Sequence, residues 1–259
     1  MQTGAITSYI DVAQLTLYAF WLFFAGLVYY LHRENKREGY PLVDEKSGIA
    51  KVEGYPRVPR EAKGFVQYDG SVILAPRDER IDPVNGTPIA GFPGAALQPN
   101  GDPLLSEMGP GAYALRADVP DHCFDDHGPK IIPLRALPDW FLAWEDPDVI
   151  GMTVHGLDGV NAGTVVDAWV DRSEVVVRYL EVELDAAIGQ GRVLIPMNFL
   201  TIKKKAREIH TNTILGRQFA TVPRTRNPET ITMLEEEKVL AYYGGGLLYA
   251  TPDRAEPVL

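Results

Sequence analysis

The 259-residue sequence contains a single cysteine, Cys123, and has 25 lysine and arginine residues against 35 aspartate and glutamate residues. One cysteine cannot form an internal disulfide, so the chain is not a small secreted scaffold stapled by disulfides. The formal net charge of −10 argues against nucleic acid as the main partner, because binding nucleic acid requires a basic surface. A mean hydropathy of −0.10 excludes a membrane protein with many spans and leaves room for one.

The sequence also lacks the short motifs that mark common enzyme classes. It contains no GxGxxG, GxxxxGK[ST], GxSxG or HExxH pattern, and it has no paired cysteines for zinc. We interpret the three consecutive glycines at Gly244–Gly246 as a packing or helix-capping feature rather than a phosphate-binding loop. These absences disfavour an enzyme.

Charge is absent from one long stretch, residues 12–31, in which only Gln14 and Thr16 are polar. A helix of that length covers about 30 Å, the thickness of the hydrocarbon core of a bilayer. A buried core helix would show polar positions at the helical period, and a secretory signal would have basic residues before the apolar run. Neither pattern is present, so the sequence predicts one transmembrane helix.

Basic residues follow this stretch directly, namely Arg33, Lys36 and Arg37. Because lysine and arginine remain on the cytoplasmic side, we expect residues 1–11 to form a short periplasmic N-terminus and the bulk of the chain to be cytoplasmic. A lone reduced cysteine fits that compartment.

Prolines concentrate in the segment that follows, residues 32–148, where 15 of the 20 lie between Pro41 and Pro147. Each proline removes a backbone donor and disfavours helix at the preceding residue, so long regular elements are not expected. The segment is either a disordered linker or an irregular chain ordered by packing against other protein. Its aromatic residues, which include Trp140, Phe141 and Trp144, favour the ordered alternative with short strands.

Residues 149–259 have a β-rich pattern. Runs of β-branched and aromatic residues at 165–170, 175–184 and 192–197 are separated by turn signals, which predicts a small antiparallel barrel or sandwich. The second run alternates polar with apolar side chains, and this predicts one polar and one apolar face. The polar positions are Tyr179, Glu181 and Glu183.

A C-terminal helix is predicted after Thr232. Thr232 and Glu235 have the spacing of a capping box, in which each side chain accepts a hydrogen bond from the backbone of the other residue. We expect the helix to run through residues 234–243 and to be loosened by Gly244–Gly246.

Two polar clusters are candidates for chemistry. The first lies in residues 121–127 and contains histidines and carboxylates that could bind a divalent ion or exchange protons. Its spacing matches no specific metal site, and the flanking prolines favour a solvated loop; we therefore predict no metal, with His127 and Asp125 as weak candidates. The members of the cluster are His122, Cys123, Asp125, Asp126 and His127.

The second cluster is formed by Asp171, Glu174 and Arg178, at a predicted turn between two strands. Taken alone, these residues are ordinary surface charges. The basic run at 203–207 is interpreted as a solvated turn, with contact to anionic lipid headgroups as the alternative.

The combination of segments resembles one known family, the H subunit of the purple-bacterial photosynthetic reaction centre. The resemblance runs nearly from end to end, with the segments in the same order, and the region from 150 to 215 resembles the PRC barrel named after this subunit. The segments after the span are REGYPL (37–42), NGDPLLSEMGPGAY (100–113), PKIIPLR (129–135), GTVVDAWVDRSE (163–174), RYLEVEL (178–184), LIPM (194–197) and LEEEKVLAYYGGGLLYATPDRAE (234–256).

This resemblance implies a non-catalytic, non-pigment-binding subunit in the inner, intracytoplasmic or chromatophore membrane of a bacterium. Such a subunit stabilises the L and M core on its cytoplasmic face, shields the quinone sites and contributes to proton transfer to the secondary quinone. Other subunits are expected to hold bacteriochlorophyll, bacteriopheophytin, quinones, non-haem iron and carotenoid. The expected partners are L and M, a cytochrome subunit, the light-harvesting antenna and membrane lipids, with no nucleic acid.

The resemblance also assigns roles to residues. By motif, Glu174 matches the family's acidic residue near the secondary quinone, and Asp171 and Arg178 match its charged neighbours. A carboxylate buried among charges can have a perturbed pKa and relay protons. Relatives often carry a pair of histidines just before the lysine and isoleucine of PKIIP, whereas this chain has only His127 there, so a two-histidine metal site is in doubt. Asp125, Asp126 and His127 remain candidates for proton collection.

Two other functions compete with this one. A single-pass membrane enzyme would need a catalytic constellation that the sequence lacks. A single-pass membrane adaptor with a PRC barrel in another complex would need only the span and the barrel, whereas this chain resembles the family in the segments around both.

Overall fold

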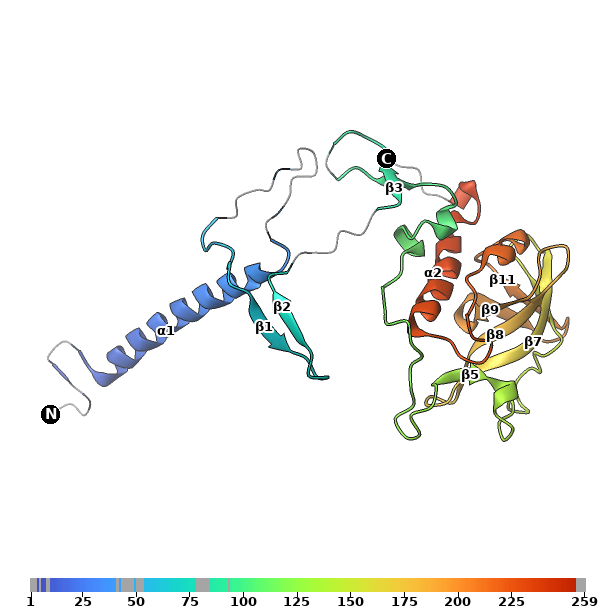
Figure 1. Ribbon diagram of the computed structural model, residues 1–259, viewed down its shortest axis with the longest axis horizontal. Coiled ribbons are helices and arrows are strands. Elements are labelled where there is room, and N and C mark those ends of the chain that lie inside the picture. The colour runs from blue at the N-terminus through green and yellow to red at the C-terminus, as the bar shows by residue number, and fades with distance from the viewer. Residues whose placement is uncertain are drawn as a thin grey trace. The chain divides into compact units, whose positions relative to one another are not determined.

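The computed structural model describes residues 4, 6–7, 10–40, 42, 49, 54–77, 84–92 and 94–254 (Figure 1). Contacts divide the chain into two compact units, the first formed by residues 1–83 and 91–94 and the second by residues 84–90 and 95–259. Of the predicted periplasmic segment, only residues 4, 6–7, 10 and 11 lie among the described residues, and parts of the 37–42 and 234–256 motifs lie outside them.

The first unit begins with helix α1, Val12–Glu34. A capping box starts the helix: the Gln14 N–H donates to Asp11 Oδ1 at 2.7 Å, and the Asp11 N–H donates to Gln14 Oε1 at 3.4 Å. No residue of α1 is buried, so within its own chain it is not a core helix. Among the described residues it is the one helix long and apolar enough to cross a membrane, in agreement with the predicted span.

A hairpin is attached to the C-terminal end of α1. Its strands are β1, Lys63–Val66, and β2, Val72–Ala75, which pair antiparallel. Arg37 Nη1 donates to the carbonyls of Glu61 at 2.6 Å and Ala75 at 3.3 Å, and Lys63 forms an ion pair with Glu34 at 3.1 Å. The charged residues after the apolar run therefore fix the hairpin to the helix end.

The second unit contains a curled sheet in the order β10-β11-β6-β7-β8-β9, with β5 added beside β7 (Figure 1). Strands β7, β8 and β9 confirm the three predicted runs. The predicted small, mainly antiparallel β domain is confirmed, with two differences in detail: β11 and β6 pair in parallel, and within residues 94–254 no pairing joins β9 to β10, so the sheet is not a closed ring. The strands are β5 Ile131–Pro133, β6 Thr153–His155, β7 Asn161–Asp171, β8 Val176–Leu184, β9 Arg192–Pro196, β10 Leu200–Lys203 and β11 Glu208–Thr211; before them β3 Gly86–Pro88 pairs with β4 Leu97–Pro99.

Both faces of β8 are largely buried, although alternation predicted one polar face. Of the three predicted polar positions, Tyr179 is 3% exposed and Glu181 is 4% exposed, while the side chain of Glu183 is half-exposed. The Tyr179 hydroxyl donates to Glu236 at 3.3 Å, so a helix covers this residue, and Glu181 is compensated by ion pairs with Arg135 and Arg192. Buried polar groups are tolerated where they are paired in this way, which is why alternation misjudged their exposure.

Helix α2, Met233–Tyr249, packs beside the sheet and begins with the predicted capping box. The Glu235 N–H donates to Thr232 Oγ1 at 3.1 Å, and the Thr232 N–H donates to Glu235 Oε2 at 3.0 Å. The predicted loosening at Gly244–Gly246 was wrong, because the helix is continuous through all three glycines. Close packing accounts for at least one of them: a Cβ on Gly246 would lie 2.4 Å from the carbonyl oxygen of Thr213.

The packing role of these glycines gives a matched pair of variants. Gly246→Ala forces the helix away from the Thr213 backbone and is expected to lower the free energy of unfolding by about 1–3 kcal/mol. Gly244→Ala places its Cβ 3.4 Å from the carbonyl oxygen of Pro110 and is expected to be neutral or to raise that free energy by up to about 1 kcal/mol, since alanine favours helix. Denaturant unfolding of the full chain in mild detergent measures both, and equal effects would contradict this explanation.

Candidate functional site

The two polar clusters found in the sequence lie side by side in the structure. Strand β5 pairs with the end of β7, with Ile131 opposite Asp171, so the loop before β5 runs past the β7–β8 turn. The Arg172 N–H donates to the carbonyl of Lys130 at 2.9 Å, and Arg172 Nη1 donates to the carbonyl of Pro129 at 3.1 Å. Residues some 50 positions apart therefore form one charged surface. We call this surface the charged cluster; it consists of Asp171, Glu174 and Arg178 at the β7–β8 turn, Lys130, and the loop of residues 121–129.

The centre of the charged cluster is the carboxylate of Asp171, which is fully buried. Its Oδ1 accepts from the backbone N–H groups of Ser173 and Glu174, both at 3.0 Å. Its Oδ2 accepts from Arg178 Nη2 at 3.2 Å and lies 3.6 Å from the ammonium group of Lys130. This set of two backbone donors and two cations compensates the buried charge.

Glu174, the residue predicted first for proton transfer, shares the same two cations. Its Oε2 accepts from Arg178 Nη2 at 2.7 Å, and its Oε1 lies 3.9 Å from Lys130 Nζ. Its side chain is 54% exposed. In the chain by itself the description of a carboxylate buried among charges therefore fits Asp171, while Glu174 stands at the rim of the cluster.

The loop of residues 121–129 adds further charged side chains to the charged cluster. Asp126 accepts from the Gly128 N–H at 2.9 Å and forms an ion pair with Arg172, and together these contacts hold the pKa of Asp126 below its usual range. His127, with a φ of 55°, and Asp125 are exposed. Within residues 94–254 these two side chains do not gather with a third metal-binding group. The loop thus presents carboxylates and a histidine to solvent next to the buried charges.

Sequence reasoning missed Lys130 and Glu236. Lys130 Nζ lies within 3.9 Å of three carboxylates, those of Asp121, Asp171 and Glu174, but only the β5–β7 register brings it there. Glu236 lies on α2 and receives the Tyr179 hydroxyl; burial raises its pKa, although this hydrogen bond and the charges of two nearby arginines oppose the shift. In the sequence Glu236 is one of three consecutive glutamates, and nothing distinguishes it from its neighbours.

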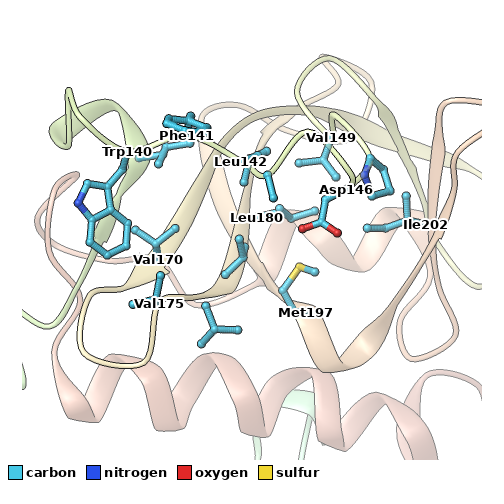
Figure 2. Close-up of a pocket in the computed structure, with 15 residues that line it drawn as sticks. Trp140, Phe141, Leu142, Asp146, Val149, Val170, Val175, Leu180, Met197 and Ile202 are labelled. Atoms are coloured by element: carbon cyan, nitrogen blue, oxygen red, sulfur yellow. The ribbon is translucent and has the colours of Figure 1, made fainter.

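An apolar pocket of about 410 Å³ lies beside the β7–β8 turn, on the side away from the charged cluster. Val175 and Val176 from the turn line it together with Trp140, Phe141 and other residues of the segment after β5, and Figure 2 shows their side chains arranged around the hollow. Phe141 is 82% exposed, and the neighbouring Trp144 is 86% exposed. Large aromatic side chains exposed beside an apolar pocket are typical of surfaces that bind another protein or a membrane.

Two family models match the chain. Residues 4–136, more than half of the sequence, match the model described as the photosynthetic reaction centre, H-chain N-terminal region. Residues 145–218, which include strands β6 to β11, match the PRC-barrel domain.

The geometry assigns different roles to two carboxylates: Asp171 is buried and stabilises the fold, whereas Glu174 is exposed at the edge of the charged cluster. Asp171→Asn removes the charge that compensates Lys130 and Arg178 in the buried site, and we expect it to lower the free energy of unfolding by about 2–3 kcal/mol. Glu174→Gln alters only the exposed ion pairs with Arg178 and Lys130 and should change the free energy of unfolding by less than about 1 kcal/mol. Denaturant unfolding followed by circular dichroism compares the two variants. A loss as large in Glu174→Gln as in Asp171→Asn would contradict the assignment.

Proposed function

This chain belongs to the photosynthetic reaction centre H-chain family, and from that membership we propose that it stabilises the L and M core on its cytoplasmic face, shields the quinone sites and carries protons toward the secondary quinone. Membership in the family implies association with the core subunits of a reaction centre. The observation that carries the finer proposal is the position of the β7–β8 turn, between the charged cluster on one side and the apolar pocket on the other.

The pocket supports a docking role for this side of the domain. Burying an exposed aromatic side chain removes large apolar areas from water, and such residues dominate the energetics of protein interfaces. A core subunit seated over Phe141 and Val175 would also cover Glu174, because Glu174 directly precedes Val175 in the same turn. Docking would therefore convert a rim carboxylate into a buried one.

The charged cluster supports the proton route. Lys130 contacts Asp121 in the solvent-facing loop as well as Asp171 and Glu174, so ion pairs connect the loop to the turn. Protons collected by Asp125, Asp126 or His127 would enter at the loop and leave at Glu174, where the secondary quinone takes up two protons with its two electrons. Arg178 holds Asp171 and Glu174 together, and the raised pKa of Glu236 provides a carboxyl that exchanges protons closer to neutral pH than an ordinary glutamate does.

The remaining parts of the proposal follow from the span and from the family. Helix α1 would anchor the chain in the bacterial inner membrane, with the N-terminus periplasmic and the basic residues after the span cytoplasmic. The pigments, quinones, iron and carotenoid would be held by other subunits, and a cytochrome subunit, the antenna and lipids would be neighbours of the complex. A generic membrane adaptor with a PRC barrel accounts for residues 145–218 and leaves the match over residues 4–136 without explanation.

Docking through the pocket has a direct test. Phe141→Ser combined with Trp144→Ser removes two exposed aromatics, each expected to contribute about 1–2 kcal/mol or more to binding. We expect less bacteriochlorophyll to co-purify with the affinity-tagged chain in mild detergent, as measured by absorbance. Val160→Ser, an exposed apolar residue outside the pocket, is the control. An unchanged pigment yield in the double variant would place the interface elsewhere.

The proton route is tested at Glu174. Glu174→Gln removes the carrier but leaves Asp171 and both cations in place, so the second electron transfer to the secondary quinone should slow by about a hundredfold, the lower end of the range for a positioned proton carrier. Primary charge separation should be unchanged, because it moves no proton. Flash kinetics on the whole complex measure both steps.

The matched control is Glu183→Gln, which also removes a half-exposed glutamate paired with an arginine, in this case Arg192 at 2.8 Å. It should leave both rates at their original values. Equal second-electron rates in Glu174→Gln and in the unmodified complex would remove Glu174 from the route.

A further inference from the structure

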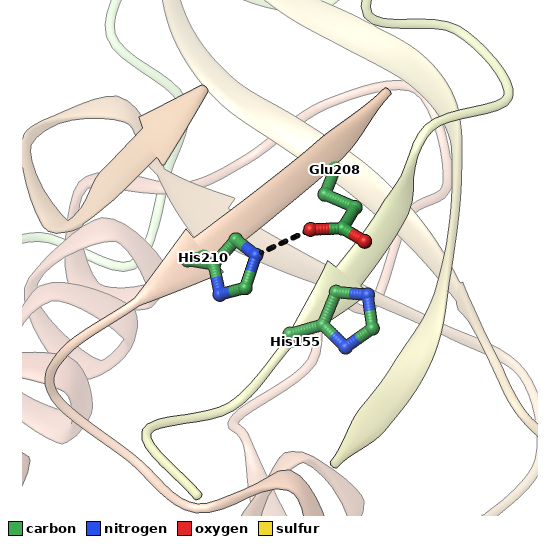
Figure 3. Close-up of side chains that lie close together, drawn as sticks. All are labelled: His155, Glu208 and His210. Atoms are coloured by element: carbon green, nitrogen blue, oxygen red, sulfur yellow. Dashed lines mark hydrogen bonds and ion pairs between the residues drawn. The ribbon is translucent and has the colours of Figure 1, made fainter. Parts of the chain in front are cut away.

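A third polar cluster lies away from the charged cluster, where β6 and β11 run side by side. These strands pair in parallel, with His210 opposite His155 and Glu208 opposite Thr153. Because side chains two positions apart on a strand share a face, Glu208 and His210 project toward the same side, and His155 joins them from the neighbouring strand (Figure 3). One ligand atom from each of His155, Glu208 and His210 lies within 4.8 Å of the other two.

The hydrogen bonds of His155 fix which of its nitrogens is available. Its Nδ1 lies 3.1 Å from the carbonyl oxygen of Gly159, and a carbonyl only accepts, so Nδ1 carries the proton. In the neutral ring Nε2 then bears the lone pair and accepts from the Thr153 hydroxyl at 3.2 Å. A backbone carbonyl that holds the far nitrogen of a histidine is the usual support for a metal-binding imidazole.

His210 and Glu208 complete the donor set. His210 Nε2 donates to Glu208 Oε2 at 2.9 Å, and this bond holds the pKa of Glu208 below its usual range, so the carboxylate is ionised. The rings of His155 and His210 stack with centroids 4.9 Å apart. All three residues are partly exposed, which leaves the donors open to an ion arriving from solvent.

We propose that His155, Glu208 and His210 form a binding site for one divalent transition-metal ion of the Zn²⁺ class, with a fourth position open to water. Two imidazoles and a carboxylate suit such ions better than Ca²⁺ or Mg²⁺, which prefer oxygen-only sites. Ligand atoms about 2.1 Å from a tetrahedral ion lie about 3.4 Å apart, so the most distant donors need to approach by at most about 1.4 Å.

Binding of the metal ion displaces a proton from His210 and links strands β6 and β11. The ion takes the place of the Nε2 proton of His210 between the imidazole and Glu208; a neutral ring regains a proton at Nδ1, and an imidazolium releases its Nε2 proton to solvent, so the bound ring is neutral in both cases. Lys203 lies opposite Glu208 on β10, but it is exposed and hydrated, so it opposes the ion weakly. The strands that the ion would join share only three paired positions, and the ion would therefore raise the stability of this domain.

The test uses the full chain in mild detergent, stripped with a chelator and titrated with ZnCl₂ by calorimetry. We expect one ion per chain, a higher thermal midpoint with Zn²⁺ than without it, and a loss of affinity of about tenfold or more in each of His155→Gln, Glu208→Gln and His210→Gln. Co²⁺ should give the visible absorption of a four-coordinate ion with the unmodified chain.

The control is His127→Gln, in the exposed loop of the charged cluster, which should bind Zn²⁺ with unchanged affinity. Histidine ring resonances of the unmodified chain provide a readout that needs no variant: of the five histidines, two should shift with Zn²⁺. Absence of saturable binding, or binding that is lost in His127→Gln and retained in His155→Gln, would overturn the proposal.

Discussion

The pairing of β5 with β7 depends on buried charge. Strand β5 has only three paired residues, yet a cation lies at each end of it, Lys130 before the strand and Arg135 after it. Lys130 meets the buried carboxylate of Asp171, and Arg135 lies 2.7 Å from the buried Asp167. A shift of one residue would separate both pairs and remove one cation from each of two buried carboxylates, which costs more than a surface ion pair contributes. Because this register positions the 121–129 loop, the charged cluster exists only through it.

Several features were readable from the sequence because they depend on local pattern. Three patterns predict their elements from neighbouring residues alone: the uncharged stretch at residues 12–31, the three β-branched runs and the Thr232 capping box. The structure confirms all three. The alternation in β8 was misleading, because a buried glutamate such as Glu181 is polar in sequence and compensated in space. Continuity of α2 through Gly244–Gly246 was missed for a related reason, since only the approach of the Thr213 backbone explains the glycine at 246.

The candidate site shows the same limit. Asp171, Glu174 and Arg178 were identifiable from their motif, and the structure places them in mutual contact. Lys130 was not, because its role requires the β5–β7 register. His155 could not be connected with Glu208 and His210, which lie 53 and 55 positions away, before the parallel β6–β11 pair was known. Pairing between distant strands carries no local signal, so sites assembled by such pairing are the ones that sequence reasoning fails to find.

The conformation of the β7–β8 turn explains how one short segment separates a charged surface from an apolar one. Val175 has a φ of 55°, a region that β-branched residues rarely adopt, and it is 72% exposed. Such strain persists only where surrounding contacts impose it, and the hydrogen bonds from Ser173 and Glu174 to Asp171 do so immediately before Val175. A partner over the pocket would bury Val175 and exclude water from Glu174, and ion pairs with Lys130 and Arg178 strengthen as water leaves. The proton-carrying property that we propose for Glu174 therefore requires the assembled complex. The isolated chain already holds Lys130, Arg178 and the backbone donors to Asp171 in position.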